Sequence, residues 1–143
     1  MVNYLQLNKL HEKFAARGLQ ILAFPCNQFG HQEWPTEEEI PLSLNHVRPG
    51  NGYVPRFPLF SKLKVNGKGT HPVFQFLRYR CTNPRTDISD SNADVIWSPV
   101  SQSDLSWNFE KWLIDKKGQP VYRYPGRWDP VELESDIERL LKQ

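Results

Sequence analysis

Three side chains in this sequence, Gln32, Trp107 and Asn108, could together stabilise a negative charge that develops during a reaction. Each of them supplies an N–H donor and carries no formal charge. Converged donors of this kind stabilise an anion such as a thiolate or a selenolate. Because neither a nucleophile nor a general base accompanies them, their spacing alone leaves plain packing open as the alternative role.

The segments around these residues predict where they lie. Residues 19–24 form an apolar run without alternation, which predicts a parallel strand covered on both faces. Gln32 follows in the next loop, where open α/β sheets place their ligand sites. Residues 107–114 alternate and predict another strand. Neighbours within a strand point to opposite faces, so Trp107 and Asn108 can share a site only at a strand end.

The remaining segments predict a single α/β domain over residues 1–143. We expect a helix of about four turns from Tyr4 that stops at Gly18, then a short helix that is capped by Thr36 and Glu39 and disturbed by Pro41. An exposed loop at 48–53, a helix capped by Thr70 and a surface loop at 83–93 should follow. The chain should end with a hairpin of 107–114 with 120–124 and a final helix through Leu133, Ile137, Leu140 and Leu141. A first helix leading into a parallel strand requires another strand before Asn3, and none is present.

Composition excludes several classes of protein. A formal net charge of +2 over 143 residues gives no basic face for nucleic acid, and no apolar run is long enough to span a bilayer. Cys26 and Cys81 are far apart, and the four histidines lack the spacing of metal ligands, so neither a disulfide scaffold nor a metal site is expected. The first residues show no signal-peptide pattern.

Several segments, in order along the chain, closely resemble those of glutathione peroxidases. These segments are FPCNQFGHQE at 24–33, KVNG at 64–67 with HPVF at 71–74, IWSPV at 96–100 and WNFEKWL at 107–113. The resemblance runs from about Asn3 to Lys142. It implies a thioredoxin-like fold, a central mixed sheet flanked by helices, here with the first strand or strands missing. It also implies reduction of hydrogen peroxide and organic hydroperoxides by glutathione in response to oxidative stress.

The resemblance also assigns site residues. By motif position, Gln32, Trp107 and Asn108 match the family residues that assist a catalytic selenocysteine or cysteine, and Arg48 and Arg127 match arginines that bind glutathione. The family often has two adjacent arginines where this chain has Gly126-Arg127. Glutathione is a co-substrate, and no other cofactor is implied.

The family's catalytic segment, Asn-x-Ala-Ser-x-(Sec/Cys)-Gly, is absent from this chain. Aligning the first helix places the missing residue a few positions upstream of Met1, and neither Cys26 nor Cys81 matches it. We expect selenocysteine there, because a UGA codon misread as a stop would make the protein begin directly behind it. The 143-residue chain alone is accordingly expected to be inactive and poorly folded.

Subtype features favour the tetrameric, glutathione-using branch. The 48–53 loop and the 96–100 segment resemble parts that the monomeric branch lacks, and no resolving cysteine lies between Glu39 and Pro58. A homotetramer is expected for the complete protein, with no nucleic-acid or membrane partner. A thioredoxin-dependent peroxidase and an inactive truncated binding module stay open as alternatives. Cys81 after Arg80 and the ending at 135–137 resemble the secreted form, so both cytoplasmic and secreted locations are left open.

Overall fold

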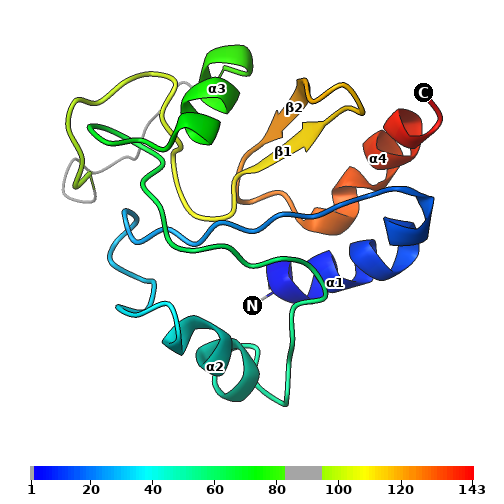
Figure 1. Cartoon of the computed structure of the whole chain (residues 1–143), viewed down its shortest axis with the longest axis horizontal. Coiled ribbons are helices and arrows are strands. Elements are labelled where there is room, and N and C mark those ends of the chain that lie inside the picture. Colours follow the sequence, from blue (N-terminus) through cyan, green and yellow to red (C-terminus); the bar gives the residue numbers. More distant parts are fainter. Residues whose placement is uncertain (1, 83–94) are drawn as a thin grey trace. The chain divides into compact units, whose positions relative to one another are not determined.

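The computed structural model describes residues 2–82 and 95–143, so the predicted loop at 83–93 lies outside the described residues. The chain forms two compact units. The first comprises Met1–Pro25, Glu33–Lys62 and Asp129–Gln143, and the second comprises Cys26–Gln32 and Leu63–Trp128. Figure 1 shows the helices and strands of both. No helix of the described residues is both long and apolar enough to cross a membrane.

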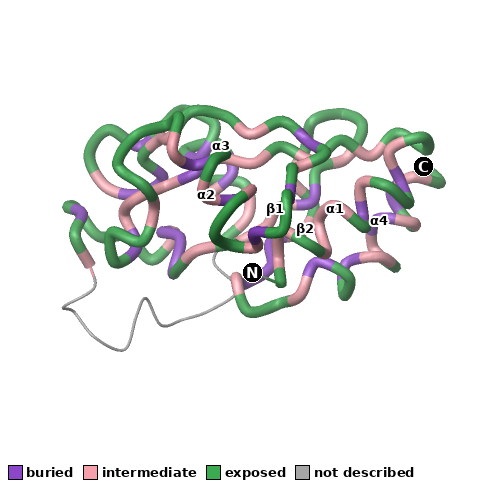
Figure 2. Tube along the Cα trace, turned by 90° about the horizontal axis from the view of Figure 1, so that it is seen from below, coloured by how far each residue is buried: buried purple, intermediate pink, exposed green. Residues whose placement is uncertain are grey.

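The ends of the chain build the first unit. Helix α1 (Val2–Phe14) continues into a 3-10 turn, η1 (Ala15–Arg17), and stops at Gly18 with φ 105°, as predicted. Helix α4 (Glu134–Leu141) follows the 3-10 turn η3 (Pro130–Leu133), which contacts α1. Leu133, Ile137 and Leu140 of the predicted apolar face are buried, and Leu141 is half-buried. In Figure 2, buried and exposed stretches alternate along α4.

Helix α2 (Glu39–His46) begins later than the capping box predicts. Glu39 Oε2 does accept from the Thr36 amide at 3.1 Å, but Glu38 is the residue that precedes the helix. Pro41 does not disturb α2, because it lies in the first turn, where the backbone N–H has no helical acceptor. Ile40 and Leu44 of this helix pack with Tyr53 in a buried cluster.

Tyr53 ties the loop after α2 to α1. Its hydroxyl donates to the Tyr4 carbonyl at 2.8 Å. Burial raises the pKa of Tyr53 to about 12 and also raises the pKa of Tyr4. Both phenols are therefore neutral over the physiological pH range.

Residues 19–24 do not form the predicted strand. The parallel pairing is present only as a single bridge between Ala23 and Leu59. Leu22, expected to be covered, is 51% exposed. A strand requires a ladder of successive backbone hydrogen bonds, and among the described residues the ladder here is limited to the bonds of Ala23 with Pro58 and Phe60.

The second unit contains helix α3 (Pro72–Arg80) and an antiparallel hairpin of strands β1 (Lys111–Ile114) and β2 (Pro120–Tyr124). The predicted cap of α3 is wrong by one residue: His71 Nδ1 accepts from the Val73 amide, whereas the Thr70 hydroxyl donates to the Gly67 carbonyl. The hairpin is confirmed, but residues 107–110 are not part of β1. This difference matters for the candidate site.

Candidate active site

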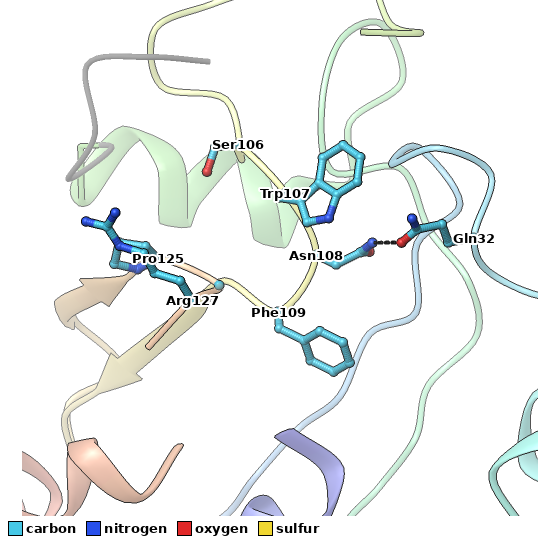
Figure 3. Close-up of a pocket in the computed structure, with 8 residues that line it drawn as sticks. Gln32, Ser106, Trp107, Asn108, Phe109, Pro125 and Arg127 are labelled. Atoms are coloured by element: carbon cyan, nitrogen blue, oxygen red, sulfur yellow. Dashed lines mark hydrogen bonds between the residues drawn. The ribbon is translucent and has the colours of Figure 1, made fainter. Parts of the chain in front are cut away.

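Gln32, Trp107 and Asn108 line one pocket of about 400 Å³ in the second unit (Figure 3). Arg127 lines the same pocket, together with Ser106, Phe109, Pro125 and Gly126. The structure therefore brings together four of the five site residues that the sequence predicts. The pocket opens between the loop of Gln32, the coil before β1 and the turn after β2.

A direct hydrogen bond joins the two amides. Asn108 Nδ2 donates to Gln32 Oε1 at 3.0 Å. This bond uses the acceptor oxygen of Gln32 and one of the two amide hydrogens of Asn108. Among the described residues no group accepts from Gln32 Nε2, so the N–H donors of the glutamine stay available to a bound group. Because the oxygen of Gln32 is already hydrogen-bonded, this side chain has only N–H donors left to offer, and such donors bind an anion.

The indole of Trp107 has its own support. Its ring lies 5.8 Å from the ring of Phe29, between centroids, and Phe29 is 2% exposed. A Cβ at Gly30 would already touch the Trp107 ring at 3.6 Å. In Figure 3 the indole nitrogen is turned toward the side of Asn108. All three of these side chains line the same pocket.

Trp107 and Asn108 share the site for a reason that alternation does not predict. They lie in coil before β1, and Phe109 has a left-handed φ of 61°. This conformation is rare for a bulky residue, because its Cβ crowds the backbone. The chain therefore turns at Phe109, and two adjacent side chains can line one pocket. The predicted strand over residues 107–110 is wrong at this point.

A buried ion pair supports the backbone just before Trp107. The side chains of Glu110 and Arg123 are 0% and 1% exposed, and Arg123 Nε donates to Glu110 Oε2 at 2.8 Å. Glu110 Oε1 accepts from the Ser106 amide at 2.5 Å and from the Ser106 hydroxyl at 2.8 Å. The Arg123 guanidinium also lies over the ring of Trp112 and donates to the Asp104 carbonyl at 2.9 Å. Sequence reasoning missed this pair, since neither residue has a motif that marks it as buried.

The turn that carries Arg127 is fixed by Lys111 and Gly126. Lys111 Nζ donates to the carbonyls of Gly126 at 3.2 Å and Trp128 at 2.7 Å. A Cβ at position 126 would lie well inside van der Waals contact with the Asn108 carbonyl oxygen. Glycine at this position therefore permits the turn of Arg127 to pack against the backbone of Asn108. In Figure 3 the Arg127 side chain extends away from the pair of amides.

The fifth predicted site residue, Arg48, belongs to the first unit. It is exposed after the end of α2, and its amide donates to the Ser43 carbonyl at 2.8 Å. Cys26 and Cys81 do not form a disulfide with each other. Burial raises the pKa of Cys81, and the nearby positive charge of Arg123 partly opposes this shift. No cluster of residues suited to a metal ion is found among the described residues.

Comparison with known sequences gives one consistent result. The sequence model of the family described as "Glutathione peroxidase" matches residues 1–78. Glutathione peroxidase 1 of Macaca fuscata fuscata is 49% identical over 144 residues, which cover 99% of this chain and 72% of the relative. Glutathione peroxidase 1 of Mus musculus is 48% identical with the same coverage. A glutathione peroxidase of Molluscum contagiosum virus subtype 1 is 50% identical and covers 96% of this chain and 64% of its own.

Solved structures agree on the fold. A crystal structure of T. cruzi GPX1 superimposes with a TM-score of 0.64 at 25% identity, covering 98% of this chain and 71% of that one. A crystal structure of Trgpx in apo form gives a TM-score of 0.63 at 24% identity, covering 99% and 71%. The expected thioredoxin-like α/β fold is confirmed. With the matched motifs, these relatives show that the chain belongs to the glutathione peroxidase family.

Proposed function

We propose that this chain is the larger part of an enzyme that reduces hydroperoxides with glutathione, and that Gln32, Trp107 and Asn108 stabilise its reacting anion. The observation that carries the assignment of residues is the hydrogen bond from Asn108 Nδ2 to Gln32 Oε1, next to the indole of Trp107. It leaves uncharged N–H donors on side chains that line one pocket. Such donors stabilise both an attacking anion and the charge on a departing oxygen, with little reorganisation.

The balanced reaction consumes one hydroperoxide and two glutathione molecules. The O–O bond breaks, the alcohol and water leave with the two thiol protons, and the two sulfurs join in a disulfide. The catalytic selenocysteine or cysteine belongs to the upstream segment that the resemblance implies, and it supplies the nucleophile. The residues of this chain hold that nucleophile in its anionic form and bind the two substrates.

Arg127 is the proposed docking group for glutathione within the second unit. Glutathione carries two carboxylates, and a guanidinium binds a carboxylate with two parallel hydrogen bonds. Arg127 is exposed at the pocket, and its turn is held by Lys111. Arg48 is proposed as a second docking group. In the complete protein we propose a single thioredoxin-like domain over residues 1–143 with its upstream strand, assembled as a homotetramer.

The choice of reductant tests this function. In the complete protein, glutathione is expected to support steady peroxide turnover, and thioredoxin is expected to support almost none. Arg127→Ala should slow the glutathione step about tenfold and leave the peroxide step unchanged, because one charge-assisted contact to a substrate carboxylate is lost. The two steps are separated by initial rates at varied concentrations of both substrates.

Arg139→Ala is the matched control, because Arg139 is exposed on α4 and pairs with Asp136. It should change neither step. Turnover with thioredoxin at the rate seen with glutathione would establish the thioredoxin-dependent alternative. Absence of turnover with either reductant, in a folded protein that holds the upstream residue, would establish the non-enzymic alternative.

Restoring the second family arginine is expected to harm the site. Gly126→Arg places a Cβ against the Asn108 carbonyl oxygen, so the turn or the backbone of Asn108 must shift. Such overpacking costs about 1–3 kcal/mol of unfolding free energy. We expect a slower peroxide step and no gain in the glutathione step, measured in the same assay. A faster glutathione step with unchanged stability would show that the backbone relaxes at no cost.

A further inference from the structure

Two amide side chains outside the pocket, one half-buried and one buried, connect the loop of Gln32 to the segment of Trp107. They are Gln28, in the loop 26–32, and Asn66, which is 0% exposed and follows Val65. Neither of them lines the pocket. Together they form a chain of hydrogen bonds from one side of the site to the other.

The first link joins Gln28 to the backbone at 65–66. Gln28 Oε1 accepts from the amides of Val65 at 2.7 Å and Asn66 at 3.0 Å, and Gln28 Nε2 donates to the Asn66 carbonyl at 3.0 Å. Val65 is 1% exposed and Asn66 is 0% exposed, so their amides need a hydrogen-bond acceptor inside the protein, and the glutamine supplies it. Gln28 therefore fixes loop 26–32 to this backbone with three bonds.

The second link joins Asn66 to the segment that leads into Trp107. Asn66 Oδ1 accepts from the Leu105 amide, and Asn66 Nδ2 donates to the Leu105 carbonyl, both at 2.9 Å. Leu105 is 5% exposed and lies in coil, so no neighbouring strand supplies these two bonds. One side chain thus satisfies both polar backbone groups of the residue two positions before Trp107.

We propose that Gln28 and Asn66 are positioning residues that set the separation between Gln32 and the pair Trp107 and Asn108. The proposal rests on the proposed function for its kinetic consequence. Gln32 is four residues from Gln28, and Asn108 is three residues from Leu105. The bond from Asn108 to Gln32 closes this ring of contacts. Without these two side chains, loop 26–32 and the coil segment before Trp107 lose the hydrogen bonds that join both of them to the backbone at 65–66.

The kinetic test uses Gln28→Leu in the complete protein, with Asn66→Ala as a second variant. A displacement of about 1 Å in an aligned site costs up to about 10²-fold in rate. We expect the rate constant of the peroxide step to fall about tenfold or more in each variant. The glutathione step should change less than about threefold, because the turn of Arg127 is held by Lys111.

Gln75→Ala is the matched control. Gln75 lies in the same unit, and its Nε2 donates to the Thr70 carbonyl at 2.7 Å, so it also loses one side-chain bond to a backbone carbonyl. If Gln28 only supported the fold, Gln28→Leu and Gln75→Ala would both lower the free energy of unfolding. The ratio of the peroxide rate to the glutathione rate would then be the same in the two variants. Gln28→Glu keeps the two acceptor bonds and should restore part of the peroxide step.

A readout without activity separates this proposal from the proposed function. The indole signal of Trp107 and the side-chain amide signals of Gln32 and Asn108 in nitrogen–proton spectra should shift in Gln28→Leu and stay in place in Gln75→Ala. If these signals shift in Gln28→Leu while the complete unmutated protein shows no peroxidase turnover, the positioning role is supported and the proposed function is overturned. Unshifted signals with unchanged kinetics in Gln28→Leu would overturn the positioning role, even if Asn66→Ala fails to fold.

Discussion

Replacing Gln32 with alanine, or Trp107 with phenylalanine, is expected to slow peroxide reduction by the complete protein by about 10²–10³-fold. Each change removes one oriented N–H donor from the region where negative charge develops. The phenylalanine keeps a ring that can pack against Phe29 and lacks only the indole N–H. The rate constant of the peroxide step, measured at saturating glutathione and varied peroxide, reports the loss.

Two exposed residues of the same types serve as controls for these variants. Within the part of the chain that the structure describes, the Gln20 side chain donates only to the neighbouring Ile21 carbonyl, and the side chain of Trp34 is not part of the pocket. Gln20→Ala and Trp34→Phe should therefore leave the peroxide step unchanged. If the two site variants also leave it unchanged while remaining folded, Gln32 and Trp107 have no part in the chemistry.

Removing one partner of the buried pair Glu110 and Arg123 is expected to cost about 3–5 kcal/mol of unfolding free energy. Glu110→Gln leaves the Arg123 guanidinium at 1% exposure without its charge partner, and Arg123→Met leaves the Glu110 carboxylate uncompensated. The double variant should be more stable than either single variant, because no isolated charge then stays buried. Urea unfolding of the complete protein measures all three.

The exposed pair on α4 provides the comparison. Arg139→Met breaks an ion pair whose side chains are 56% and 25% exposed, so it should cost no more than about 1 kcal/mol. A loss of this small size in Arg123→Met as well would mean that water reaches the Glu110 pair. The pair also holds Ser106, so the single variants should slow the peroxide step in addition.

The sequence determined the features that depend on residues close together in the chain. The periodic apolar positions and Gly18 placed α1, and those near the C-terminus placed the buried face of α4. The predicted pairing of 107–114 with 120–124 placed the hairpin. Local hydrogen bonds and side-chain periodicity decide such elements, so a pattern of a few residues is sufficient. The motifs also identified the family, and they predicted Gln32, Trp107 and Asn108 as its site residues.

Other features depend on residues far apart in the sequence, and only the tertiary structure decided them. The apolar run at 19–24 lacks a ladder on the described residues and forms one bridge, because a strand exists only with its partners. The left-handed φ of Phe109 and the close approach of Gly126 to Asn108 bring Trp107, Asn108 and Arg127 to one pocket. Burial of Glu110 with Arg123 likewise follows from packing, because the residue type alone does not tell whether a charged side chain lies on the surface or in the core.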